Sequence, residues 1–356
     1  MKKSPDQPKL NKQTIIYAGI ALLIVAAIVM IAWSLRAPSP VKTAAVDEKN
    51  RPLTVISMLA VGDINLGRQT GQKILAGDAN YAFEYLSEAL QKPDITFGNL
   101  ESQLADLNGE TQSPTNEYRF AGPPAGADGL KSAGFDIVSI ANNHMWDYGK
   151  DRLFETIDNL ERVGVPYVGA SKDPAKVYQP TILDIRQQKV AFFAATDILN
   201  GYEKSGATEY VAWADPDKLI PAVEAAQETA DWIIVSMHWG TEYSSTPKAS
   251  QIELAHKLID AGAYMVIGSH PHVPQGVEEY NGGVILYSLG NFAFWQPMTY
   301  WTQHSFMADI QLRPSGRVDY TPIPINSGWQ PRLSSDTATE EKILKYIAKL
   351  SEPFTK

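Results

Sequence analysis

The sequence predicts an α/β domain whose central strands are largely parallel. One observation is a set of short, continuous apolar runs, which are typical of strands buried on both faces. A second is that segments with apolar residues three and four positions apart, typical of amphipathic helices, alternate with these runs. A third is that a polar loop follows each run directly. Because parallel sheets bind ligands beyond the carboxyl ends of their strands, these loops predict one shared site.

The apolar runs predict six buried strands. They cover residues 55–61, 94–97, 135–140, 232–237, 264–267 and 284–286. Two further pairs of segments are each joined by a short polar turn, and they predict antiparallel hairpins. These pairs are 179–185 with 189–196, and 305–312 with 317–323.

Five segments predict helices between the strands. They cover residues 81–92, 125–133, 150–163, 217–229 and 247–261. Three of them are followed by Gly134, Gly164 and Gly262, which fit C-terminal caps because glycine readily adopts the left-handed backbone that ends many helices. After the main domain, expected at 53–327, residues 328–356 predict a tail. Its amphipathic helix at 340–350 is expected to cover the core.

The N-terminal part predicts a membrane anchor. Residues 15–35 are apolar and uncharged, and as a helix they would span roughly 32 Å, about the thickness of the bilayer interior. Four lysines precede them, which places residues 1–14 in the cytoplasm and the main domain outside. Residues 36–52 predict a linker. A cleavable signal peptide is the alternative, but its apolar region is usually about 7–15 residues long, and no convincing cleavage site follows here.

Charge and composition exclude several classes of function. The sequence has no cysteine, so thiolate metal sites and cysteine nucleophiles are excluded. Residues 37–356 carry 26 Lys and Arg against 39 Asp and Glu, a net charge of −13, which disfavours nucleic acid as a partner. There is no GxSxG motif, P-loop or GxGxxG motif, so any ATP-driven step belongs to a partner.

The loops after the predicted strands carry side chains that bind metals. Asp, Glu, Asn and His side chains lie in these loops, namely Asp63, Glu101, Asn143, His144, His238, His270 and His272. Carboxylate, amide and imidazole ligands without sulfur suit Zn, Mn, Fe or Co. We therefore expect one or two divalent transition-metal ions. Two such ions together lower the pKa of bound water and hold the attacking and leaving oxygens.

Three neighbouring residues are candidates for catalysis. His144 is expected either to take part in catalysis or to support a metal ligand. Asp147 is expected to orient His144 or to shape the loop. Arg68 can grip a carboxylate or phosphate through two hydrogen bonds, or it can form a surface ion pair.

The motifs also resemble a known family, the bacterial capsule synthesis proteins of the CapA/PgsA type. The resemblance covers roughly residues 54–325. It rests on GDINLGR (62–68), GNLES (98–102), ANNHMWDYG (141–149), HWGTEY (238–243), GSHPHV (268–273) and YSLGNFAF (287–294). It implies a fold similar to calcineurin-like metallophosphatases, a four-layer αββα sandwich with metals at one end of the sheets. It also implies poly-γ-glutamate capsule synthesis at the cell membrane, with a ligase and a small membrane subunit as partners.

The resemblance implies roles for individual residues. Asp63 would be the first metal ligand, Glu101 the bridging carboxylate and His144 the imidazole beside the reaction. Asn143, His238, His270 and His272 would complete the ligand set. Two positions depart from the metallophosphatase pattern: Asn65 stands where these enzymes have histidine, and Glu101 stands where they usually have aspartate. One of the two metal positions is therefore expected to be the weaker.

Three functions follow from these observations. The first is a membrane-anchored, extracytoplasmic subunit of capsule or poly-γ-glutamate synthesis or export. The second is a metal-dependent hydrolase of phosphoesters or γ-glutamyl amide bonds, whose substrate is an acidic polymer or a phosphoester. The third is a polymer-binding module without catalysis, which the asparagine at position 65 favours.

Overall fold

The computed structural model describes residues 54–355. The predicted cytoplasmic segment, anchor and linker, residues 1–52, lie outside this range. Within it, no helix is both long and apolar enough to span a bilayer.

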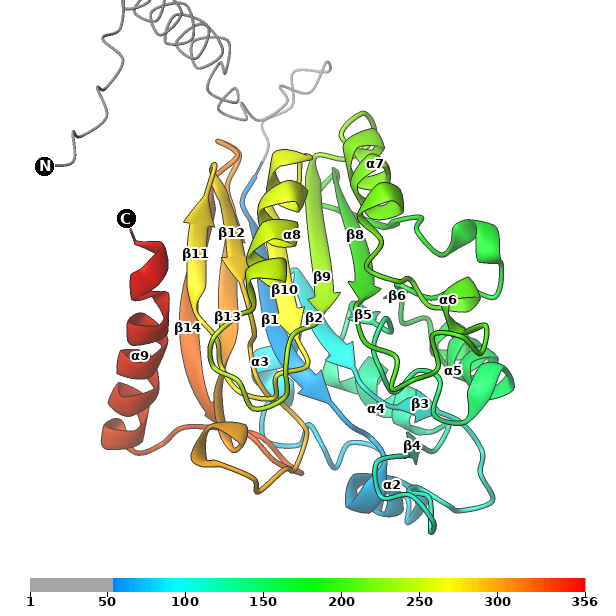
Figure 1. The fold of residues 1–356 in the computed structure, drawn as a ribbon. Coiled ribbons are helices and arrows are strands. Elements are labelled where there is room, and N and C mark those ends of the chain that lie inside the picture. Colours follow the sequence, from blue (N-terminus) through cyan, green and yellow to red (C-terminus); the bar gives the residue numbers. More distant parts are fainter. Residues whose placement is uncertain (1–53, 356) are drawn as a thin grey trace, which may run out of the picture. The chain divides into compact units, whose positions relative to one another are not determined.

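Two mixed sheets form the centre of the fold (Figure 1). The first has seven strands, in the order β15 (Arg332–Leu333), β14 (Val318–Asn326), β13 (His304–Leu312), β1 (Ile56–Ile64), β2 (Ile95–Leu100), β5 (Ile137–Ser139) and β6 (Tyr167–Val168). The second has six, in the order β11 (Val277–Tyr280), β12 (Gly283–Leu286), β10 (Met265–Ser269), β9 (Trp232–His238), β8 (Gln188–Thr196) and β7 (Thr181–Ile185). A small parallel pair joins β3 (Gln103–Leu104) to β4 (Ala121–Gly122).

The central strands are parallel, and antiparallel strands lie at the margins. β1, β2, β5 and β6 pair in parallel, as do β8, β9, β10 and β12. The two predicted hairpins are present as β7–β8 and β13–β14. The expectation of an α/β domain with largely parallel central strands is confirmed.

Alternating side chains explain why the strands are apolar throughout. In the six-stranded sheet, Phe192 and Ile234 belong to the core shared with the seven-stranded sheet. Their neighbours Phe193 and Ile233 belong to a second core shared with the helices. The Phe97 ring of β2 stacks on the Phe192 ring of β8 at 5.8 Å between centroids, so the two sheets pack face to face.

Helices cover the outer faces of both sheets. The longer ones are α2 (Arg68–Leu75), α4 (Gly126–Ala133), α5 (Gly149–Val163), α7 (Pro216–Ala226), α8 (Ala249–Asp260) and α9 (Thr337–Ser351). The short ones are α3 (Ser87–Gln91), α6 (Ala207–Tyr210) and the 3₁₀ turns η1 (Pro174–Lys176), η2 (Tyr300–Thr302) and η3 (Glu352–Phe354). Apolar residues of α7 and α8 cover the six-stranded sheet, and those of α4 and α5 belong to the core of the seven-stranded sheet.

Capping residues end or begin several of the helices. Gly134 and Gly164 adopt left-handed backbone directly after α4 and α5. The Asp336 side chain accepts a hydrogen bond from the Thr339 amide and begins α9, the predicted terminal helix. The helix predicted at 81–92 is shorter, because residues 79–86 form turns and only Ser87–Gln91 are helical.

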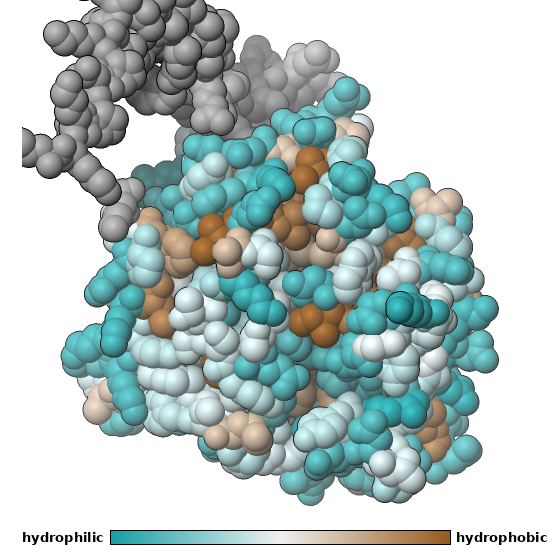
Figure 2. Space-filling view, viewed as in Figure 1, coloured by the Kyte–Doolittle hydropathy of each residue, from teal (hydrophilic) through white to brown (hydrophobic). Residues whose placement is uncertain are grey.

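The terminal helix α9 packs against the sheet margin. It contacts β11, β13 and β14, and it stands beside β11 and β14 in Figure 1. Ile343 and Ile347 are its buried apolar residues. The face of the molecule shown in Figure 2 is mostly hydrophilic, and its hydrophobic residues lie in separate small patches.

Candidate metal centre

The predicted ligands meet at the carboxyl ends of the parallel strands. Asp63 is the penultimate residue of β1, and Glu101 directly follows β2. His238 ends β9, while His270 and His272 lie in the loop that follows β10. All five side chains are at least 96% buried. Strands from both sheets therefore direct metal-binding atoms into one small volume.

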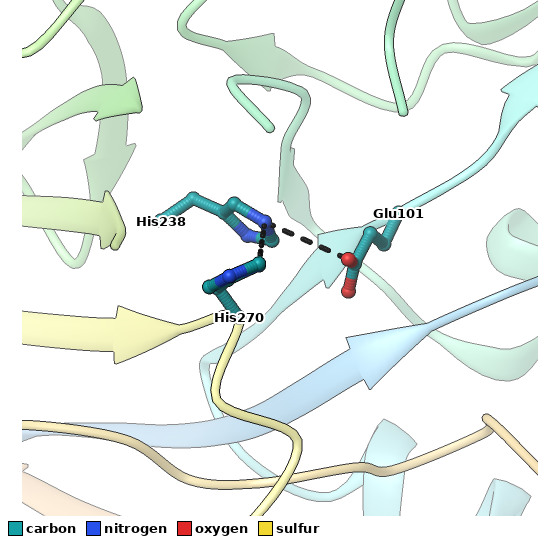
Figure 3. Close-up of side chains that lie close together, drawn as sticks. All are labelled: Glu101, His238 and His270. Atoms are coloured by element: carbon teal, nitrogen blue, oxygen red, sulfur yellow. Dashed lines mark hydrogen bonds and ion pairs between the residues drawn. The ribbon is translucent and has the colours of Figure 1, made fainter. Parts of the chain in front are cut away.

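Glu101, His238 and His270 form the first group of potential ligands (Figure 3). Their side chains point toward one another, with Glu101 Oε1 at 3.5 Å from His238 Nε2 and His270 Nδ1 at 3.1 Å from the same nitrogen. Two ligands each about 2.1 Å from one ion lie roughly 3–3.5 Å apart at tetrahedral or octahedral angles. The observed separations fit this geometry.

Asp63, Glu101 and His272 form a second group. Glu101 Oε1 lies 3.8 Å from His272 Nε2, and Asp63 Oδ2 lies 3.0 Å from His272 Nδ1. Glu101 belongs to both groups, which is the arrangement that a carboxylate shared by two ions requires. The described residues thus form a cluster that can hold metal.

The carboxylate of Glu101 carries the clearest sign of a cation. It is fully buried, and neither of its oxygens has a hydrogen-bond partner among the described residues. Burial, followed by the charges of Asp63 and Glu242, raises the pKa of Glu101 well above its usual value. A buried carboxylate without a donor is costly to the fold. A positive ion beside it removes that cost, so the donor set fits a metal.

The imidazoles are held in the form that binds metal. Burial lowers the pKa of His238 and of His270 well below the usual histidine value, and the neighbouring histidines add to the shift. Neutral imidazole is the ligand form. His238 Nδ1 lies 3.0 Å from Ser269 Oγ, a contact that orients the ring and leaves Nε2 facing Glu101.

The loop after β10 has an uncommon backbone. His270 and His272 have φ values of 94° and 58°, in the left-handed region that side chains with a Cβ rarely adopt. Such conformations persist where the surroundings enforce them, and they concentrate at functional sites. Here they turn both imidazoles toward Glu101.

The loop after β5 adds Asn143, His144 and Asp147 to the centre. Asn143 Oδ1 lies 2.8 Å from His238 Nε2, within reach of the first group. His144 Nδ1 lies 2.8 Å from Asp147 Oδ2, and its Nε2 lies 3.9 Å from Glu101 Oε1. Asp147 also accepts a hydrogen bond from the Phe120 amide. The Asp147 carboxylate thus contacts both the His144 ring and the backbone of the neighbouring loop.

Arg68 lies beside the centre, and it forms no ion pair among residues 54–355. Its guanidinium carbon sits 4.6 Å above the Phe120 ring, and Nη2 donates to the Glu117 carbonyl. Its Nε is buried and has no hydrogen-bond partner. Desolvation lowers the pKa of this guanidinium. Arg68 therefore keeps hydrogen-bonding capacity for another group.

A cavity of 720 Å³ opens over the centre. His144, Asp147, His272 and Arg68 all line it. Aromatic side chains form much of the remaining wall, namely Tyr118, Phe120, Tyr202, Tyr243, Phe294, Trp295 and Trp329. A small substrate or the end of a polymer chain fits a cavity of this size and reaches the metal ligands.

Asn65 shapes the loop after β1. Its Oδ1 accepts a hydrogen bond from the Gly67 amide at 2.8 Å, and this contact holds the turn that follows the strand.

Sequence reasoning missed two residues of the site. Glu242 forms a third potential metal group with His270 and His272. Its signal was its place in the HWGTEY motif, four residues after His238. Asn200 donates a hydrogen bond to the Asn143 carbonyl and accepts one from the Asn143 side chain. No pattern marked Asn200, because only the fold brings it to that loop.

Known proteins similar to this chain include two capsule proteins of Bacillus. PGA biosynthesis protein CapA of Bacillus subtilis (strain 168) is 31% identical over 353 residues, covering 97% of this chain and 89% of that protein. Capsule biosynthesis protein CapA of Bacillus anthracis is 30% identical over 356 residues, covering 96% and 84%. A relative from Mycobacterium tuberculosis (strain H37Rv), named a probable polyglutamine synthesis accessory protein, is 30% identical over 217 residues, covering 56% and 55%.

Solved structures with a similar arrangement share little sequence with this chain. A hypothetical protein from Thermus thermophilus has a TM-score of 0.48 and 15% identity, covering 76% of this chain and 100% of that one. A 5'-nucleotidase from Candida albicans SC5314 has a TM-score of 0.42 and 12% identity, covering 86% and 55%. Similarity at this level carries no information about activity.

The family model described as bacterial capsule synthesis protein PGA_cap matches residues 57–296, which include every predicted ligand and candidate catalytic residue. Together with the two near-full-length Bacillus relatives, this match shows that the chain belongs to the bacterial capsule synthesis protein family.

Proposed function

We propose that this chain is a membrane-anchored, extracytoplasmic accessory subunit of poly-γ-glutamate capsule synthesis or export, and that it acts through a metal centre. Family membership and the names of the relatives support the capsule role. The apolar segment at 15–35 supports the anchor. The observation that carries the metal centre is Glu101, a buried carboxylate without hydrogen-bond partners that belongs to two groups of potential ligands.

The ligand set divides into two overlapping positions. Glu101, Asn143, His238 and His270 would hold one ion, while Asp63, Glu101 and His272 would hold the other. Divalent ions bound there supply a Lewis acid and a nucleophile generated from water. Mn, Zn and Fe all suit these ligands.

Metal-dependent hydrolysis is the second candidate function, and the pairing of His144 with Asp147 favours it. The Asp147 carboxylate accepts the Nδ1 proton of His144, which leaves the other ring nitrogen toward Glu101 and the cavity. From there His144 can give a proton to a leaving group or stabilise the charge that develops on it. Arg68 lines the cavity, where its guanidinium can bind a carboxylate or phosphate of the substrate. Both γ-glutamyl polymers and phosphoesters carry such a group.

The capsule role is tested by deleting the gene in its host and restoring it with variants. We expect loss of surface polymer on deletion, recovery with the unchanged gene, and no recovery with the double substitution His238→Ala and His270→Ala. His256→Ala is the matched control, since this imidazole lies on α8 and contacts Glu278 instead of the centre. Normal polymer in the deletion strain would refute the role. Recovery with the double variant would show that the capsule role does not need the metal centre.

A further inference from the structure

Glu242 is the one residue of the three potential metal groups, among residues 54–355, that reaches the centre from the solvent side. It is exposed and lines the cavity, while the other members are buried. One of its carboxylate oxygens lies with ring nitrogens of His270 and His272 in a group whose atoms are within 4.8 Å of one another. Ligand atoms this close can share an ion after small side-chain rotations.

Each ion position has an asparagine oxygen beside its carboxylate and imidazole ligands. Asn143 Oδ1 lies 2.8 Å from His238 Nε2, and Asn291 Oδ1 lies 3.0 Å from His272 Nδ1. Carboxylate oxygen suits Mn, Zn and Fe alike. Glu242 shares a group of potential ligands with His272, and both residues line the cavity, so Glu242 can reach the ion position of His272 from the cavity side.

Backbone hydrogen bonds hold Glu242 in place on both sides. The Trp239 amide donates to the Ser269 carbonyl at 3.1 Å, and the Tyr243 amide donates to the Pro271 carbonyl at 2.8 Å. These bonds join the loop after β9 to the loop that carries His270 and His272. The backbone on either side of Glu242 is therefore attached to the loop that carries both imidazoles.

The charges around Glu101 also indicate a cation on this side. Asp63 and Glu242 each share a group of potential ligands with His272, and the buried carboxylate of Glu101 has no donor of its own among the described residues. Three carboxylates close to the same imidazoles repel one another unless positive charge lies among them. Arg68 is not in ion-pair contact with any of them among the described residues.

We propose that Glu242 is a metal ligand that completes the ion position of Asp63, Glu101 and His272 from the cavity side. The proposal rests on the proposed metal centre and assigns one further residue to it. Glu242 also interacts with the Tyr243 hydroxyl, where burial and the Glu242 carboxylate raise the pKa of Tyr243 to about 12. A purely structural role would therefore consist of holding Tyr243, and the experiment separates the two roles.

The test measures metal binding by the full-length protein in detergent. After chelator treatment, Mn²⁺ and Zn²⁺ are titrated by calorimetry into the unchanged protein, E242Q, Y243F, E117Q and H238A. We expect two equivalents for the unchanged protein. In E242Q one equivalent remains and the affinity of the second falls about tenfold or more. Y243F removes the tyrosine partner of Glu242, and E117Q removes another carboxylate of the cavity wall; both should bind as the unchanged protein does.

The outcomes separate this proposal from the one on which it rests. If E242Q binds two equivalents with unchanged affinity while H238A loses one, the centre stands and the role of Glu242 is wrong. If Y243F loses as much affinity as E242Q, Glu242 acts through Tyr243 and is not a ligand. If the unchanged protein binds neither metal, both proposals fail. Absorption spectra of the Co²⁺ forms provide a second readout, since loss of a ligand in E242Q should change the visible bands and Y243F should leave them unchanged.

Discussion

The two groups of ligands that share Glu101 are built in different ways. His238 and His270 come from neighbouring strands of one sheet, and the pairing of Ser269 with His238 sets their separation. Asp63 and His272 come from different sheets, so their 3.0 Å contact depends on how the sheets dock. Strand pairing thus sets the separation of the two histidines in the first group, where only Glu101 comes from the other sheet. In the second group the contact between Asp63 and His272 itself depends on tertiary packing, so we expect the second group to be the easier one to disrupt.

The contact that joins the sheets at this point is a backbone contact. The Asp63 amide donates to the Gly290 carbonyl, and the Phe292 amide donates to the Asp63 carbonyl. A Cβ added at Gly62 would lie 1.8 Å from the Gly290 oxygen. Only glycine permits β1 to approach the loop after β12 this closely.

The largest loss of stability is expected for Gly62→Ala. The added methyl group must push β1 away from Gly290, and we expect the free energy of unfolding to fall by about 3 kcal/mol, at the upper end for overpacking. Gly77→Ala is the control, because its Cβ would meet no atom within 4 Å and only its φ of 100° opposes the change, at about 1 kcal/mol. Urea titrations of both variants measure the difference. Equal losses would mean that the close approach at Gly62 does not matter.

Glu101→Gln is expected to abolish both ion positions while stabilising the metal-free protein. The raised pKa of Glu101 means that the folded state holds its proton more tightly than the unfolded state, so the metal-free protein loses stability as the pH rises above the usual value of 4.5. The glutamine variant lacks this loss. In chelator, the melting temperature of the glutamine variant should therefore exceed that of the unchanged protein by an amount that increases as the pH rises above about 4.5.

Bound metal should make the unchanged protein more stable than the Glu101→Gln variant. At 100 times the dissociation constant, one ion stabilises a protein by about 2.7 kcal/mol, and only the unchanged protein can gain it. Melting temperatures with and without metal at neutral pH measure both effects. A variant that gains as much from metal as the unchanged protein would show that Glu101 is not a ligand.

Single substitutions on either side of Glu101 should each remove one ion. His238→Ala removes a donor of the first group, and Asp63→Asn weakens a donor of the second. Elemental mass spectrometry should find about half of the metal in each variant. Loss of all metal in both variants would show that the two positions cannot fill independently.

The smallest loss of stability is expected at the amino ends of β1 and β2, which lie at the other end of these strands from the metal centre. Asp94 accepts hydrogen bonds from Ser57 and Arg186, and these outweigh the effect of burial and hold the pKa of Asp94 below 3.8. Stability from this pair is present above that value and is lost as the pH falls through the lowered pKa. The pair is partly exposed, so Arg186→Ala should cost at most about 1 kcal/mol at neutral pH and less at pH 3. The metal content of the Arg186→Ala variant should equal that of the unchanged protein. A loss of metal would show that the amino ends of these strands are coupled to the metal centre.

Much of the centre was predictable because its residues follow strands. Once 55–61 and 232–237 are recognised as buried strands, the next polar residues must lie at one end of the sheets, which gave Asp63 and His238. The helix at 81–92 was overestimated, because apolar spacing alone does not reveal where residues 79–86 turn instead. The membrane anchor stays a prediction, since residues 15–35 lie outside the described range.

The sequence by itself determined the strands, the parallel direction of the central ones and the kinds of side chain that meet at their ends. These features are local, since period, apolar content and neighbouring motifs lie within a few residues of one another. Only the tertiary structure decided that Glu101 belongs to both ligand groups, that Glu242 reaches the centre, and that Asn200 holds Asn143. Each of these depends on the docking of loops from different strands. No pattern in the sequence encodes the distances between such loops, because packing fixes them only after the whole domain has folded.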